Sequence, residues 1–255
     1  MRSFLSELKK RNNLLYWFGI YNFSIVILCI ILMQFGSLQI LGVSCWLKPM
    51  KFYLSVGIMA WTMGWLMYYL DNSKAIKRFS IAIGISMFFE NGLILMQAIR
   101  GTTSHFNNSS AFNSIVFSLM GIVILAFTIT SILICIRFFR QKQFTIPPSY
   151  VWGIRLGILF FIIFSLEGGI MISIMQHTVG AADGGPGLPV FNWSTAHGDL
   201  RIAHFLGIHS LQVLSLLGYY VARTKTQALI FSLVYVALVT GILIQALSGI
   251  PLFSQ

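Results

Sequence analysis

Two carboxylates and two imidazoles fall within long apolar stretches of this 255-residue chain, where ionisable side chains are costly and are candidates for function. They are Glu90, Glu167, His204 and His209. Glu90 and Glu167 predict a pair of catalytic carboxylates, acting as general acid and base, or the relay groups of a proton pathway. The alternative is a structural ion pair of either glutamate with a basic residue, Arg201, Arg100 or Lys51.

The histidines also predict a metal site. We expect His204, His209 and His105 to be its ligands, because imidazole and carboxylate donors suit zinc, iron and copper, and histidine also holds haem iron. His204 and His209 are five residues apart, which separates them by about 140° around a helix, so they would not chelate side by side. The alternative is that the histidines hydrogen-bond to the glutamates and to Gln97 and only hold the helices together.

Further polar residues cluster at the same ends of the predicted helices and are expected to contact a substrate or support the site. They are Gln97, Arg100, Asp183, His197, Asp199, Arg201, Gln212, Lys48 and Lys51. Together with all five histidines they place the predicted site in the outer half of the helix bundle. Lys48 and Lys51 would attract an anionic headgroup or substrate there, or else extend to the outer lipid phosphates.

The composition identifies the environment of these residues. Hydrophobic residues make up 57% of the chain and charged residues only 9%, whereas about a quarter of the residues of a soluble domain are charged. The chain is therefore predicted to be an integral membrane protein in contact with membrane lipids. Its pI of about 9.9 reflects the positive-inside rule rather than nucleic-acid binding.

Seven apolar runs are long enough to cross about 30 Å of hydrocarbon. They cover residues 14–35, 52–71, 79–99, 114–136, 150–174, 201–222 and 228–250. We predict an all-α, polytopic bundle of seven transmembrane helices that forms a single domain over residues 1–255. The segment 175–200 is rich in Gly and Pro and predicts a structured outer loop.

The basic residues predict the orientation of this bundle. With a cytoplasmic N-terminus, thirteen of the seventeen Lys and Arg residues, Arg2 included, lie on the inner side. The four outer ones are Lys48, Lys51, Arg100 and Arg201. The C-terminus then lies outside, and the protein is predicted to be a multi-pass protein of the cell membrane.

Two pairs of glycines predict close helix packing. Gly153 and Gly157 form a small-xxx-small motif, and Gly168–Gly169 directly follow Glu167, where another backbone could approach. Neither pair predicts chemistry of its own.

Three functions are compatible with these residues. The leading hypothesis is a metal-dependent membrane enzyme or redox protein that acts on a lipid-soluble or periplasmic substrate. The alternative is a transporter, channel or ligand-binding sensor that uses the same residues for proton or substrate contacts, with a small or lipid-soluble ligand. A second alternative is a structural subunit of a membrane complex.

Three stretches carry a resemblance. They are Trp46-Leu47-Lys48-Pro49-Met50-Lys51-Phe52, Arg100-Gly101 with Ser104-His105-Phe106-Asn107, and the run from Gly184 through Asn192-Trp193-Ser194 to Gly198-Asp199-Leu200-Arg201 and His204. The chain resembles an uncharacterised family of bacterial seven-span inner-membrane proteins, which implies a localisation but no activity. In architecture alone it is similar to the progestin-and-adipoQ receptor and alkaline ceramidase superfamily. That superfamily holds zinc with a His-x-x-x-His in its last span, and residues 228–250 lack this motif.

Overall fold

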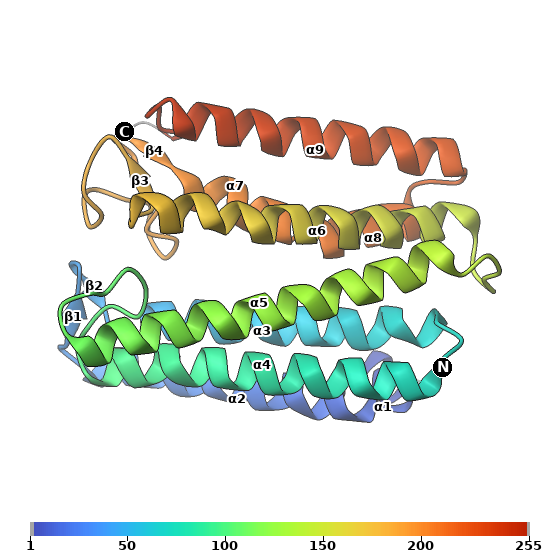
Figure 1. The fold of residues 1–255 in the computed structure, drawn as a ribbon, viewed down its shortest axis with the longest axis horizontal. Coiled ribbons are helices and arrows are strands. Elements are labelled where there is room, and N and C mark those ends of the chain that lie inside the picture. The colour runs from blue at the N-terminus through green and yellow to red at the C-terminus, as the bar shows by residue number, and fades with distance from the viewer. Residues whose placement is uncertain (1–2, 254–255) are drawn as a thin grey trace. The chain divides into compact units, whose positions relative to one another are not determined.

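The computed structural model describes residues 3–253 and contains two compact helical units, Met1–Arg137 and Phe138–Gln255 (Figure 1). In the described range the strands are two residues long and form two small antiparallel pairs. The predicted all-α class is therefore confirmed. Arg2, one of the predicted inner cations, lies outside the described residues.

The first unit is built around long helices joined by short connections. Its elements are α1 (Phe4–Arg11), α2 (Asn13–Phe35), β1 (Gln39–Ile40), β2 (Val43–Ser44), α3 (Leu47–Leu66), the 3-10 helix η1 (Met67–Tyr69), α4 (Ser73–Ile99) and α5 (Ala111–Arg140), whose last three residues belong to the second unit. Asparagines start two of these helices, because Asn12 and Asn72 accept the backbone N–H groups of Leu15 and Ala75. The β1–β2 hairpin and the α4–α5 loop lie at the same end of this unit (Figure 1).

The second unit contains α6 (Pro148–Ile174), β3 (Thr178–Val179), β4 (Gly198–Asp199), α7 (Leu200–Ile208), α8 (Ser210–Tyr220) and α9 (Lys225–Leu247). Pro148 begins α6, where its missing N–H costs nothing. The predicted close packing at Gly153 and Gly157 is confirmed. A Cβ atom on Gly153 would meet the carbonyl oxygen of Leu214 on α8, and one on Gly157 would lie 3.0 Å from that of Ser210. Small residues therefore let α6 and α8 approach closely.

Five helices in residues 3–253 are long and apolar enough to cross a membrane: α2, α4, α5, α6 and α9. The pair α7 and α8 would add a sixth span, bent by 43°, where the sequence predicted one continuous run at 201–222. The predicted run 52–71 corresponds to α3, which is helical but falls outside this set. Lys48, Pro49 and Lys51 lie in its first turns and lower the hydropathy of this 20-residue helix. The structure thus supports a multi-pass membrane protein with five or six spans, and a seventh span remains a prediction.

Several of these helices expose large apolar side chains on their outer surfaces. Leu233 and Leu238 on α9 are 67% and 63% exposed, and Ile115 and Ile122 on α5 are similarly open. Contiguous apolar exposure of this kind is unfavourable in water and is the surface that lipid tails require. The exposed apolar faces of these helices therefore agree with the membrane environment that the composition predicts.

Candidate functional site

A carboxylate and an imidazole meet inside the second unit. Glu167 on α6 is 8% exposed, and its Oε2 atom lies 3.0 Å from Nδ1 of His204 on α7. The other oxygen, Oε1, is buried and has no hydrogen-bond partner in the described part of the chain. The two groups can share one proton, either as carboxylate with imidazolium or as carboxylic acid with imidazole. The unused oxygen remains available to one further donor.

Glycine provides the space for this contact. A Cβ atom on Gly168 would lie 3.3 Å from Cε1 of His204, whereas one on Gly169 would meet nothing within 4 Å. The expectation that another backbone approaches both glycines is therefore wrong. A histidine side chain lies against Gly168, and Gly169 is open.

A second buried carboxylate lies within the first unit. Glu90 on α4 is 2% exposed, and its Oε1 atom is 4.0 Å from Nε2 of His105, which belongs to the α4–α5 loop. Its Oε2 atom is buried and unpartnered among residues 3–253. The pair thus repeats the arrangement of Glu167 and His204, with a longer separation that a small movement of the ring would close.

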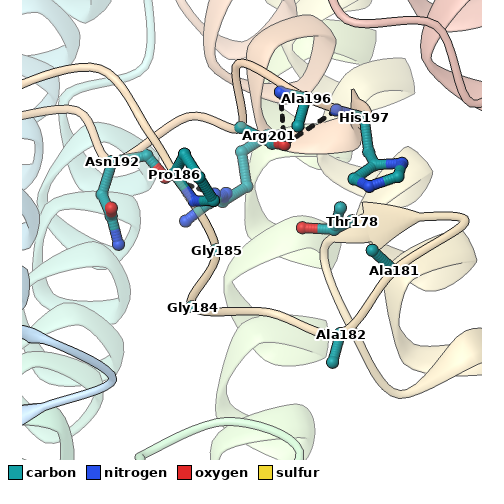
Figure 2. Close-up of a pocket in the computed structure, with 11 residues that line it drawn as sticks. Thr178, Ala181, Ala182, Gly184, Gly185, Pro186, Asn192, Ala196, His197 and Arg201 are labelled. Atoms are coloured by element: carbon teal, nitrogen blue, oxygen red, sulfur yellow. Dashed lines mark hydrogen bonds between the residues drawn. The ribbon is translucent and has the colours of Figure 1, made fainter.

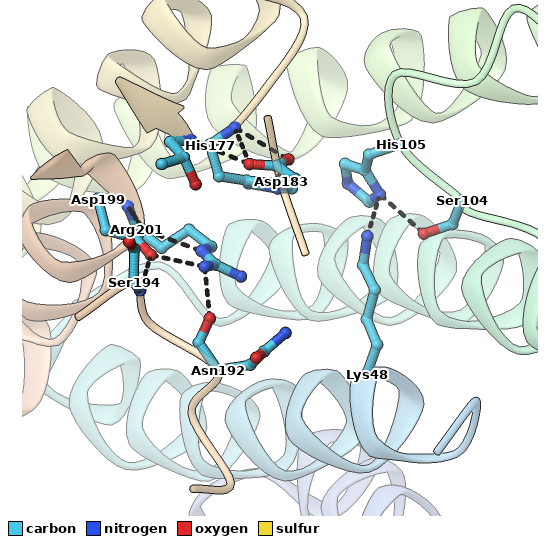
Figure 3. Close-up of polar contacts among 10 residues, drawn as sticks. Lys48, Ser104, His105, His177, Asp183, Asn192, Ser194, Asp199 and Arg201 are labelled. Carbon is cyan, nitrogen blue, oxygen red and sulfur yellow. Dashed lines mark hydrogen bonds and ion pairs between the residues drawn. The ribbon is translucent and has the colours of Figure 1, made fainter. Parts of the chain in front are cut away.

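The other nitrogen of His105 faces a lysine. Nζ of Lys48 lies 3.2 Å from Nδ1 of His105, and Oγ of Ser104 lies 2.9 Å from the same atom (Figure 3). An ammonium group only donates hydrogen bonds, so Nδ1 accepts and the proton of the neutral ring is on Nε2. That proton points toward Glu90. The contact of Lys48 with Nδ1 thus leaves the Nε2 proton of His105 facing the buried carboxylate of Glu90, 4.0 Å away.

Aromatic rings surround His105. The rings of Phe52, Phe106 and Phe117 have centroids 5.8, 6.1 and 6.3 Å from the imidazole. Such rings cover part of the imidazole, which is 23% exposed, and lower the local dielectric, which strengthens the interactions among the polar groups there. The imidazole therefore packs among these rings between Lys48 and Glu90.

Asp183 organises the loop that follows α6. Its carboxylate accepts the backbone N–H groups of His177 and Thr178, and its Oδ2 atom lies 2.6 Å from Nδ1 of His177 (Figure 3). Burial alone would raise the pKa of Asp183, but the hydrogen bonds and charge of His177, with the bonds from Thr178, lower that pKa well below its usual range. Asp183 is therefore an ionised structural group.

Asp199 closes the same loop. It is 1% exposed, caps α7 and accepts the backbone N–H groups of Ser194 and Arg201 at 2.7 and 3.0 Å. The guanidinium of Arg201 binds the carboxylate of Asp199 through Nε and Nη2, and Nη2 also donates to the carbonyl oxygen of Asn192 (Figure 3). Arg201 thus forms its ion pair with Asp199. The predicted alternative, an ion pair between Arg201 and Glu167, is not formed in this unit, where Glu167 pairs with His204.

A cavity of about 120 Å³ opens within the loop (Figure 2). Residues from several parts of the segment line it, including Thr178, Gly184, Pro186, Asn192, His197 and Arg201. His197, which the sequence placed among the supporting residues, contributes its ring to this cavity (Figure 2).

Other predicted site residues have separate contacts. Gln97 and Arg100 both bind Asn113 of α5, with Nε2 of Gln97 at 3.1 Å and Nη1 of Arg100 at 2.8 Å from its Oδ1 atom. They therefore link α4 to α5.

His209 lies at the bend between α7 and α8, where its Nδ1 is 3.2 Å from Oε1 of Gln212. His209 does not join the contact of His204 with its glutamate.

The described residues do not bring together the ligands that the predicted metal site requires. Within residues 3–253, no three His, Cys, Asp or Glu side chains are grouped so that they could hold an ion. Zinc, iron, copper and haem remain predictions.

Sequence reasoning missed an asparagine pair beside Glu90. Nδ2 of Asn91 donates to Oδ1 of Asn22 at 2.9 Å, and Oδ1 of Asn91 is buried without a partner in the described residues. Towards the other end of the unit, Asn12 donates to Ser80. The sequence signal that could have predicted this pair is the presence of Asn22 and Asn91 inside apolar runs. Ser80 and Asn91 are eleven positions apart on α4, or about 16 Å, so the buried polar groups along this helix are not continuous.

Compared with protein families, curated proteins and solved structures, the chain matches none of them. The function must therefore be inferred from the chemistry of these residues.

Proposed function

We propose that this chain is a proton-responsive membrane protein, a proton-coupled carrier or sensor, that takes up protons from the outer side of a bacterial inner membrane. One observation carries the proposal. Each helical unit contains a buried glutamate with one oxygen facing an imidazole and the other without a partner among residues 3–253: Glu90 with His105, and Glu167 with His204.

Such pairs suit reversible protonation. A buried carboxylate without enough donors is costly while ionised, and the cost falls when it gains a proton or a donor. The adjacent imidazole can supply or remove that proton, because histidine is the side chain whose ordinary pKa lies nearest neutrality. Intramembrane carboxylates and histidines of this kind are typical of proton relays in pumps and transporters.

Access from one side supports the same function. The positive-inside distribution favours a cytoplasmic N-terminus and seven spans, which puts His105 and Lys48 at the outer surface. Towards the inner end of α4, the buried side chains between Asn91 and Ser80 include Ile83 and Met87. A proton that enters past Lys48 therefore reaches Glu90 and stops there, as expected of a sensor or of a carrier open to the outside.

Infrared difference spectroscopy on the full chain in liposomes tests the proposal directly. A drop in external pH should produce carboxylic acid C=O signals from the two buried glutamates. Glu90→Gln and Glu167→Gln should each remove one signal and leave the other. Asp71→Asn, at an exposed carboxylate in the turn before α4, is the matched control and should leave both signals intact. Spectra in which neither glutamine variant changes a pH-dependent band would refute the proposal.

A further inference from the structure

We propose that the cavity in the loop between α6 and α7 binds a small monoanionic carboxylate from the outer medium. The site is separate from the buried glutamate pairs and does not rest on the proposed proton function. Its walls include Thr178, Ser194 and Arg201, which the two aspartates of the loop hold in place (Figure 2).

The cavity presents hydrogen-bond donors and no free carboxylate oxygen. Both oxygens of Asp183 accept bonds from His177 and Thr178, and both oxygens of Asp199 accept bonds from Ser194 and Arg201. These contacts occupy the only two acidic side chains of the loop. A ligand that offers acceptor oxygens is therefore favoured over a cation.

Arg201 and His197 both line the cavity and have donor capacity left. Arg201 uses Nε and Nη2 for Asp199 and Asn192, and its Nη1 atom has no hydrogen-bond partner in residues 3–253. The ring of His197 likewise has none there, since its backbone N–H alone binds Ser194. Both residues line the cavity (Figure 2). A carboxylate could accept from Nη1 of Arg201 with one oxygen and from the imidazole with the other.

Size and charge narrow the ligand class. The volume of about 120 Å³ is well below the roughly 300 Å³ at which pockets for drug-sized ligands begin, so the occupant has only a few heavy atoms. Arg201 is neutralised in part by Asp199, and Asp183 adds a second negative charge to the loop. A dianion such as phosphate is disfavoured beside these carboxylates, and a monocarboxylate of the size of acetate or lactate fits best.

Calorimetric titration of the purified full-length protein with sodium acetate and sodium lactate tests the assignment, in a carboxylate-free buffer at constant ionic strength. Inorganic phosphate and chloride are titrated in parallel. Acetate or lactate should bind, and His197→Ala or Arg201→Gln should each raise the Kd by about tenfold, as expected for losing a charge-assisted hydrogen bond. Gln176→Ala, in the same loop but outside the cavity lining, should leave the Kd unchanged.

His197→Ala keeps the bonds of both aspartates, so it separates loss of the ligand contact from loss of the loop fold. Carboxylate binding that survives both cavity substitutions would place the ligand elsewhere and overturn the proposal. Phosphate binding without acetate or lactate binding would overturn the ligand class. No binding of either carboxylate would overturn the site.

Discussion

Nδ1 of His204 lies 3.0 Å from Oε2 of Glu167, and the ring rests against the bare backbone of Gly168. The contact joins α6 to α7 inside the second unit. Because Oε1 of Glu167 is buried without a partner in the described chain, the histidine is the group that decides how this carboxylate is satisfied. The position of the ring, and hence the glycine behind it, should control protonation of the pair.

Substitution of Gly168 should therefore disturb Glu167 without touching it. A Cβ atom at position 168 would lie 3.3 Å from Cε1 of His204, so Gly168→Ala requires a small shift of the ring and Gly168→Val a larger one. We expect the carboxylic acid band of Glu167 to shift in frequency, more for Val than for Ala. Gly169→Val is the matched control, since a Cβ atom there meets nothing within 4 Å. Equal spectra for the Gly168 and Gly169 variants would contradict this interpretation.

Gly153 should be required for stability. A Cβ atom there would clash with the carbonyl oxygen of Leu214, which is backbone and cannot move aside without separating α6 from α8. Gly153→Ala should lower the free energy of unfolding by about 1–3 kcal/mol, the usual range for overpacking. Denaturant titration in detergent measures it. Gly121→Ala on α5, where a Cβ atom meets nothing within 4 Å, should be neutral or slightly stabilising because alanine favours helix.

Most of the helices could be predicted from the apolar runs of the sequence. The contacts between polar side chains could not, because they depend on how the helices and loops pack. Runs of twenty or more apolar residues predict helices because only intrahelical hydrogen bonds satisfy a backbone in lipid. The bend at His209 was not predictable, since the run 201–222 carries no proline. Glu167 and His204 are 37 positions apart, so their contact depends on how α6 packs on α7. His105 reaches Lys48 through loop conformation that no periodicity encodes.

Asp183 should stabilise its loop in a pH-dependent way. Because the native pKa of Asp183 is depressed below its unfolded value, the ionised form contributes stability above the ordinary Asp pKa of about 3.9. That contribution is lost as pH falls through the native pKa. Asp183→Asn should therefore speed hydrogen exchange of the amides of His177 and Thr178 at pH 7. The difference from the unsubstituted protein should shrink as pH falls below about 4. An exchange difference independent of pH would show that ionisation of Asp183 is not the cause.

His105 should control how fast Glu90 gains its proton. Its Nε2 atom is 4.0 Å from Oε1 of Glu90, and its Nδ1 atom faces Lys48, so the ring lies between the lysine and the carboxylate. His105→Phe keeps the aromatic packing but removes both nitrogens. After a jump in external pH, the carboxylic acid band of Glu90 should appear about a hundredfold more slowly, within the range that positioned acid–base groups contribute.

Lys48 orients this relay, and its effect can be separated from general loss of charge. Lys48→Met removes the donor to Nδ1 of His105 and frees the ring to adopt the other tautomer, with its proton turned away from Glu90. Protonation of Glu90 should slow in this variant as well. Lys51→Met removes the same charge one turn along α3 and serves as the matched control. If the two lysine variants slow the Glu90 band equally, surface charge alone sets the rate. A slower rate in Lys48→Met alone would show that the hydrogen bond to His105 directs the proton inward.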